Sequence, residues 1–86
     1  MNRVPFADVE REAEETNKPL LATDKRFRHS VRVIEDEGTT CFFMNAFYER
    51  LHEGQWIVIY SEHHRPYILS ADDVYSIQEF TEVKKP

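Results

Sequence analysis

The feature that most constrains the fold is the stretch of residues 39–60, which holds six of the chain's eleven aromatic residues. Two runs rich in aromatic and β-branched residues, 39–48 and 56–61, flank a charged segment that contains Gly54. This composition is typical of two strands joined by a turn. Both faces of both runs are largely apolar, whereas a strand with one wet face would alternate apolar and polar residues. We therefore expect both strands to be covered on both sides.

Further antiparallel strands are predicted around this pair. Residues 26–35 alternate as a first long strand, and the glycine in the segment 35–39 suits the positive φ of a hairpin turn. Residues 67–69 and 75–80 have the pattern of a fourth and a fifth strand. Residues 70–74 resemble a single helical turn between these two strands.

An N-terminal helix is predicted over residues 5–16. Phe6, Val9 and Ala13 lie at helical spacing on one narrow face, and Asn17 and Pro19 end the helix. Its glutamates cover the opposite face and predict a solvated surface rather than a catalytic pair. A helix this short is marginal alone, so we expect it to dock on the sheet.

These elements predict an α+β fold with one N-terminal helix and a five-stranded antiparallel, strongly curved sheet or SH3-like small barrel. The 86 residues form one domain. Within it we expect a helix and linker over residues 1–19, the sheet or barrel over 20–81, and a frayed tail over 82–86.

Composition indicates a globular chain, with 41% hydrophobic and 31% charged residues and a formal net charge of -5. No apolar run approaches the roughly 20 residues of a membrane-spanning helix. Cys41 is the only cysteine, and the N-terminus lacks the apolar core of a signal peptide, so we expect a cytoplasmic protein without disulfides. Because its neighbours Thr40 and Phe42 are uncharged, Cys41 is expected to be an inert, buried thiol.

Residues 28–38 (RHSVRVIEDEG) and 54–64 (GQWIVIYSEHH) resemble segments of the small orphan proteins that mobile integron gene cassettes of environmental bacteria encode. The resemblance implies a compact cytoplasmic accessory protein that is often oligomeric. It assigns no functional residue.

The aromatic residues exceed what a core of this size needs, so some are expected at an exposed patch or pocket. Tyr48, Trp56 and Tyr67 are the predicted binding residues, since their polar tips tolerate a wet rim. This favours a non-enzymatic module without a cofactor that engages a protein partner or small ligand. We also expect a homodimer through the apolar outer face of the strands 39–48 and 56–61.

A second interpretation is nucleic-acid binding. Arg26, Arg28 and Arg32 alternate on one face of the predicted first strand and could meet phosphates. The chain as a whole is acidic, however, and glutamates on neighbouring strands could neutralise this stripe.

A third interpretation is metal-dependent activity at the predicted hairpin tip, where His63 and His64 are adjacent. Neutral imidazoles are good ligands for zinc or nickel. Adjacent strand residues point to opposite faces, so the two share a metal only if the loop bends them together.

Overall fold

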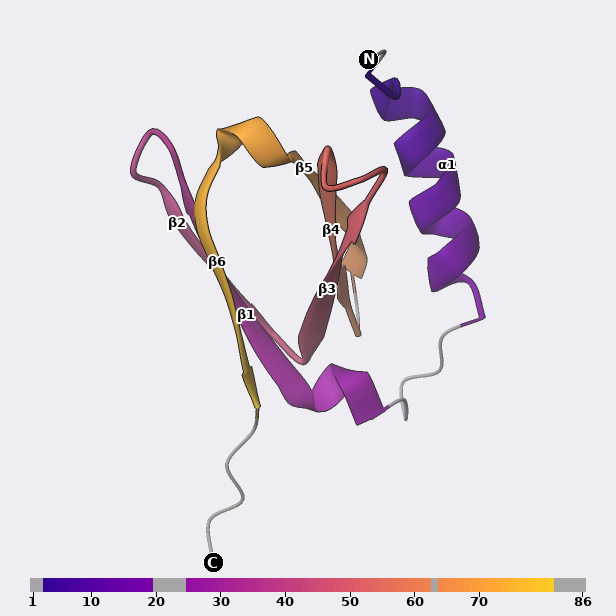
Figure 1. The fold of residues 1–86 in the computed structure, drawn as a ribbon. Helices are drawn as coiled ribbons and strands as arrows, with labels where there is room; N and C mark the ends of the chain where they lie inside the picture. The colour runs from indigo at the N-terminus through magenta and orange to yellow at the C-terminus, as the bar shows by residue number, and fades with distance from the viewer. Residues whose placement is uncertain (1–2, 20–24, 63, 82–86) are drawn as a thin grey trace, which may run out of the picture.

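The computed structural model describes residues 3–19, 25–62 and 64–81, without the side chains of Lys25, Arg26 and His64. Its elements are α1 (Phe6–Asn17), η1 (Lys25–Arg28), β1 (His29–Glu35), β2 (Thr40–Met44), β3 (Ala46–Leu51), β4 (Trp56–Ser61), β5 (His64–Ser70), η2 (Ala71–Asp73) and β6 (Val74–Thr81). Figure 1 shows three layers: a sheet of β2, β1 and β6, a second sheet of β3, β4 and β5, and α1 outside the second sheet.

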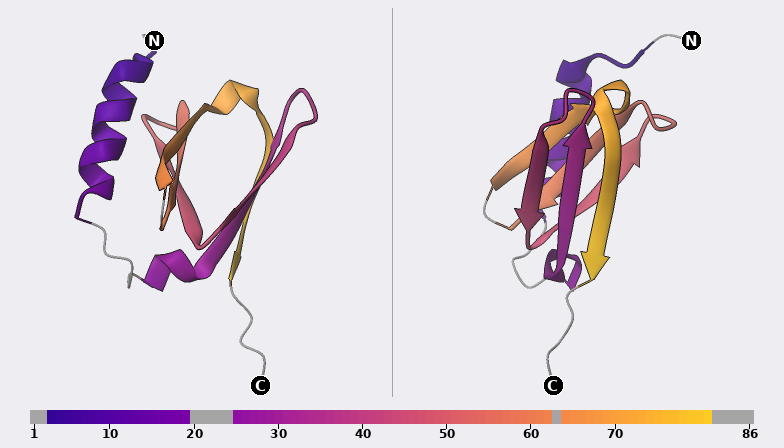
Figure 2. Two further views of the ribbon diagram at one scale, coloured as in Figure 1. Left: turned by 180° about the vertical axis from the view of Figure 1, so that it is seen from behind. Right: turned by 90° about the vertical axis from the view of Figure 1, so that its left-hand side faces the viewer.

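The α+β class with one N-terminal helix is confirmed, but the strands form two three-stranded antiparallel sheets, in the orders β2-β1-β6 and β3-β4-β5. The first sheet faces the viewer in the right-hand view of Figure 2. The prediction of a single five-stranded sheet is not confirmed, and the sheets do not close into a barrel.

The difference arises at Asn45, where the predicted strand 39–48 breaks. Asn45 has φ 52°, in the left-handed region that asparagine tolerates better than most residues. The chain turns a corner there. Before the corner Phe43 pairs with Val31 of β1, and after it Tyr48 pairs with Ile59 of β4, so one predicted strand contributes to both sheets.

Strand β4 explains why the segment 56–61 is apolar on both faces, since all six of its residues are buried. Ile57 and Ile59 pack in the core between the two sheets, while Val58 and Tyr60 pack in a second core beneath α1. The expected coverage on both sides is confirmed here. It is wrong for β2, where Phe42 is 58% exposed on the outer face.

Helix α1 docks through two of the three residues of the predicted apolar face. Val9 and Ala13 are fully buried against the sheet of β3, β4 and β5, whereas Phe6 is 49% exposed. The segment before it is tied down as well. The indole N–H of Trp56 donates to the carbonyl of Val4 at 2.9 Å, and the N–H of Val4 donates to Oε1 of Gln55 at 3.0 Å.

The predicted first strand starts later than expected. Lys25–Arg28 forms a turn of 3₁₀ helix, and β1 begins only at His29. No helix in the described ranges is long and apolar enough to cross a membrane.

Candidate functional site at the seam between β2 and β5

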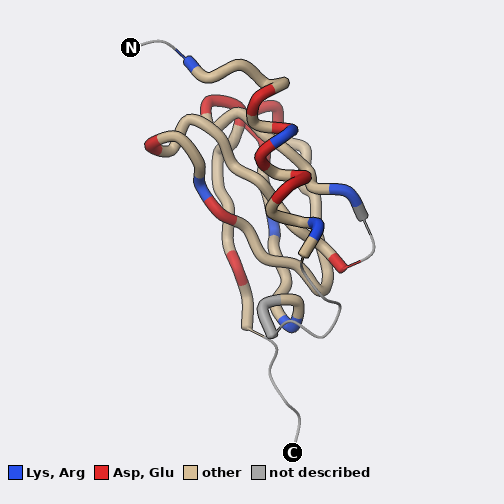
Figure 3. Tube along the Cα trace, turned by 90° about the vertical axis from the view of Figure 1, so that its right-hand side faces the viewer, with Lys and Arg blue, Asp and Glu red and all other residues tan. Residues whose placement is uncertain are grey.

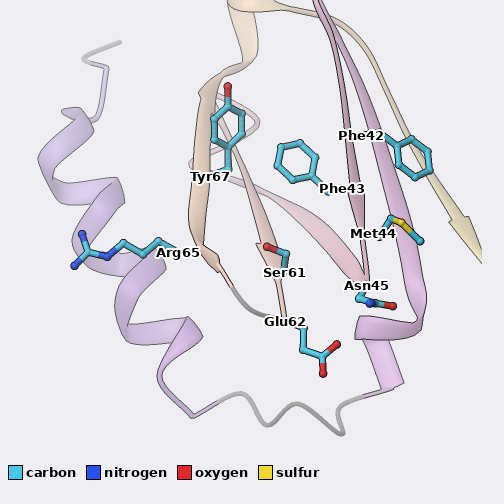
Figure 4. Close-up of a pocket in the computed structure, with 8 residues that line it drawn as sticks. All are labelled: Phe42, Phe43, Met44, Asn45, Ser61, Glu62, Arg65 and Tyr67. Atoms are coloured by element: carbon cyan, nitrogen blue, oxygen red, sulfur yellow. The ribbon is translucent and has the colours of Figure 1, made fainter.

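β2 and β5 are edge strands of different sheets, and the sandwich is open between them. A recess of about 560 Å³ lies along this seam. Figure 4 shows the residues that line it, which come from β2, the corner, the end of β4 and the start of β5: Phe42, Phe43, Met44, Asn45, Ser61, Glu62, Arg65 and Tyr67.

The aromatic wall of the recess consists of Phe43 and Tyr67. Tyr67 pairs with the buried Ile59 of β4 and Phe43 with the buried Val31 of β1, so both side chains point to the inner faces of their sheets. Their ring centroids lie 5.3 Å apart, at an interplanar angle of 40°. Phe43 also packs against the core between the sheets, which fixes this wall.

Polar groups gather at the end of the recess near the Asn45 corner. The N–H of Glu62 donates to the carbonyl of Asn45 at 3.2 Å, which ties the corner to the end of β4. Ser61 is 6% exposed and presents its hydroxyl in this region. Arg65 extends away from the other lining side chains in Figure 4 and leaves the recess open.

The opposite end of the seam is acidic. Burial raises the pKa of Tyr67 above its usual 10.0, and the negative charge of Glu35, with smaller contributions from Cys41 and Glu37, raises it further. The N–H of Asp36 donates to the carbonyl of Asp73 at 3.0 Å, which brings the β1–β2 turn beside η2. Figure 3 shows that acidic residues also dominate α1, so the negative charge is not confined to the seam.

Of the three predicted binding residues, the structure places only Tyr67 in the recess. Tyr48 is half-buried against the core between the sheets, and its N–H donates to Oε1 of Glu79 at 3.4 Å. Trp56 is 8% exposed and lies under the N-terminal segment, with the Phe6 ring 5.9 Å away and the Arg3 guanidinium 4.8 Å away.

The sequence interpretation missed three apolar recess residues, Phe42, Phe43 and Met44. The signal was present, since these residues form the aromatic-rich end of the segment 39–48. The pattern predicts one covered strand over residues 39–48, because hydrophobic periodicity indicates neither the break at Asn45 nor the open edge that results from it.

The predicted arginine stripe does not lie on one strand. Arg28 is exposed in η1, and the side chain of Arg26 falls outside the described residues. Arg32 is on the outer face of β1, where it donates to the side chain of Gln78 and lies 5.4 Å from the centre of the Phe80 ring. A continuous basic surface is therefore not formed by β1.

The proposed metal ligands cannot be placed, because His63 and the side chain of His64 are outside the described residues. Elsewhere in the described chain, no group of three or more His, Cys, Asp or Glu side chains is positioned to hold a metal ion.

Comparisons with models of protein families, with curated proteins and with solved structures give no significant match.

Proposed function

We propose that this protein is a non-enzymatic binding module that holds an apolar group of a ligand or partner in the recess between β2 and β5. The carrying observation is the open aromatic wall of Phe43 and Tyr67 beside a volume of about 560 Å³. Ligand pockets typically enclose about 300–1,000 Å³ and combine apolar walls with a few polar groups. Asn45 and Ser61 supply such groups at one end.

Binding is proposed rather than catalysis because of the groups that line the recess. The recess combines an aromatic wall with a small number of polar groups near the Asn45 corner. The amide of Asn45, the hydroxyl of Ser61 and the carboxylate of Glu62 suit the orientation of a ligand.

We further propose that the two sheets together represent an open form of the SH3-like small barrel. This proposal is supported by the chain order, in which one strand bends into both sheets at Asn45 and a short 3₁₀ turn, Ala71–Asp73, precedes the last strand. In such an open form, the gap between β2 and β5 is the place where a ligand would complete the wall.

The test is a titration of ¹⁵N-labelled protein with small apolar probes, namely indole, 4-methylphenol and cyclohexylamine at millimolar concentration. We expect at least one probe to shift the amide resonances of Phe43, Ser61 and Tyr67. Tyr67→Ala removes half of the aromatic wall and should abolish these shifts. Tyr75→Ala, at a tyrosine that is 76% exposed and outside the recess, should leave them unchanged.

Absence of any shift at these three residues in the wild-type protein, or equal shifts in the Tyr67→Ala variant, would refute the proposal.

A second candidate function is self-association through the outer face of the sheet of β2, β1 and β6. Phe42, Met44 and Phe80 lie on this face and are 58%, 69% and 42% exposed, and Phe42 and Met44 also line the recess at the edge of the sheet. The homodimer surface predicted from the sequence included the segment 56–61, whose outward side chains α1 now covers. The part of the predicted dimer surface that stays uncovered is the outer face of β2, which continues onto β1 and β6.

Sedimentation over a concentration range tests this candidate. Paired substitution Phe42→Ser and Met44→Ser should convert a dimer into a monomer with an unchanged circular dichroism spectrum. A wild-type protein that stays monomeric at all concentrations excludes it.

A further inference from the structure

The backbone of β2 offers hydrogen-bonding groups to the seam. The N–H of Glu35 donates to the carbonyl of Thr39 at 2.8 Å, which sets the phase of the antiparallel ladder between β1 and β2. Hydrogen-bonded and non-hydrogen-bonded pairs alternate in such a ladder. Cys41 and Phe43 therefore point their backbone groups toward β1. In the register of this pair, the backbone N–H and C=O groups of Thr40, Phe42 and Met44 point away from β1.

β2 also lacks the features that usually protect an edge strand. Natural edge strands are blunted by charged side chains or proline. The other edges carry them: Glu49 and Arg50 in β3, Arg65 and Pro66 in β5, and Glu79 in β6. The sequence of β2, TCFFM, contains neither a charge nor a proline. It is thus the one described edge suited to pairing with another chain.

Resting on the proposed function, we infer that the ligand of the recess is an extended peptide segment of a partner protein, which pairs with β2 as an added strand. One apolar side chain of the peptide enters the recess against Phe43 and Tyr67, and a basic side chain lies at the Glu35 end. Addition of a strand to an open sheet edge is a recurring mode of peptide recognition, in which backbone bonds give affinity and pockets give specificity.

The length of the segment follows from strand geometry. Backbone N–H and C=O groups that point away from β1 recur at every second residue, about every 6.8 Å. Residues 40–44 therefore present them over about 13 Å. A peptide of about five residues spans this distance. Side chains at alternate positions then face the recess, and the central one meets the aromatic wall.

Charge favours a basic partner segment over a second copy of this chain. The seam begins beside Glu35 and Glu37, where acidic groups already raise the pKa of Tyr67. Antiparallel pairing of two β2 strands would place the acidic β1–β2 turn of one copy near Glu62 of the other, and like charges placed opposite each other are unfavourable. A peptide with Lys or Arg meets opposite charge instead.

The experiment uses the full chain and the peptide acetyl-Thr-Lys-Thr-Phe-Thr-Lys-Thr-amide, which carries Lys on both sides of a central Phe. In the free protein, we expect the amides of Thr40, Phe42 and Met44 to exchange with deuterium rapidly and those of Cys41 and Phe43 slowly. Saturating peptide should slow exchange at Thr40, Phe42 and Met44. Replacement of both Lys by Glu should weaken binding by about tenfold or more.

Two controls isolate the backbone contribution. Two peptides are methylated at alternate backbone nitrogens, one at the odd and one at the even positions, so that each lacks the N–H donors of one edge. The peptide that lacks the donors facing β2 should bind about tenfold more weakly or worse. Thr40→Pro removes one seam-facing N–H of the protein and should act in the same direction. Thr40→Val keeps the N–H and is the side-chain control, so a loss of binding equal to that of Thr40→Pro would show that the N–H does not carry the effect.

The outcomes separate the two proposals. If the small apolar probes shift Phe43, Ser61 and Tyr67 but the peptide leaves exchange at Thr40, Phe42 and Met44 unchanged, strand addition is refuted while the recess stands as a binding site. Slow exchange at these three amides in a concentration-dependent dimer without peptide would show that a second copy occupies the edge, which also overturns the inference.

Discussion

The ring of Phe43 contacts the ring of Tyr67, with 5.3 Å between centroids, across two strands that belong to different sheets. Side chains rather than a backbone ladder therefore bridge the seam at this level. Such a contact can part and re-form without breaking a strand pair, because aromatic pairs contribute only about 0.5–1.5 kcal/mol beyond their burial. The proposed ligand would enter the seam where this ring contact parts.

Tyr67→Ala is predicted to lower the free energy of unfolding by about 1–2 kcal/mol, since it removes this ring contact from a side chain that is only partly buried. Tyr75→Ala should change it by less than about 0.5 kcal/mol, because exposed side chains contribute little. Urea denaturation of both variants measures the difference. Equal stabilities would show that the ring contact across the seam does not stabilise the fold.

The raised pKa of Tyr67 predicts a loss of stability at alkaline pH. The unfolded chain loses the phenol proton near the usual pKa of 10.0, while the folded protein keeps it to a higher pH. The contribution of the Tyr67 phenol to the free energy of unfolding is thus fully present below pH 10. It is lost as the pH rises through the pKa that Tyr67 has in the folded protein. Chemical denaturation between pH 8 and pH 11 should show a steeper decline for the wild type than for Tyr67→Phe. Parallel curves would contradict this prediction.

Trp56→Phe is predicted to destabilise the protein by about 2–3 kcal/mol, because it leaves the Val4 carbonyl without its donor and removes buried volume. Arg3→Ala is the comparison at the surface of the same segment, since Arg3 lies over the Trp56 ring and its 3.2 Å ion pair with Asp72 is exposed. Exposed pairs contribute about 0–1 kcal/mol. Denaturant unfolding should give a clearly lower free energy of unfolding for Trp56→Phe than for Arg3→Ala. The reverse order would show that the N-terminal segment is held by charge.

The spacing of apolar residues predicts the fold class correctly for the segments in which that spacing reflects burial. Val9 and Ala13 at helical spacing identified the docking face of α1, and the apolar faces of residues 56–61 identified a strand covered on both sides. Periodicity does not report a corner. The residues around Asn45 read as one strand because a single left-handed residue changes the direction of the chain without changing its hydrophobic content.

The site was less accessible to sequence reasoning for the same reason. Tyr67 was selected by its chemistry and does lie in the recess. Trp56 has the same amphipathic character, but its indole N–H is satisfied by the backbone of Val4, a contact between residues 52 positions apart. Such long-range contacts depend on how the N-terminal segment packs, which no local pattern encodes.

The corner at Asn45 gives a further prediction. Asn45→Gly should leave the free energy of unfolding within about 0.5 kcal/mol of the wild type, because glycine adopts positive φ without a steric cost. Asn45→Val should cost about 1–3 kcal/mol, since a β-branched residue is strained at φ 52°. Thermal unfolding of the two variants measures this contrast. Similar stability of both would mean that the corner can form at another residue.

The phase of hydrogen bonding along β2 can be tested by proline substitution without any ligand. The N–H of Cys41 points to β1, so Cys41→Pro should remove a ladder bond and cost about 3 kcal/mol or more. The N–H of Thr40 points to the seam, so Thr40→Pro should cost less than about 1.5 kcal/mol, as proline is tolerated at outward positions of edge strands. Cys41→Ala and Thr40→Ala separate the loss of each side chain from the loss of its N–H. If denaturant unfolding showed that Thr40→Pro lowers the free energy of unfolding more than Cys41→Pro does, the N–H of Thr40 would point to β1 instead. The backbone groups assigned to the peptide would then not be available for pairing.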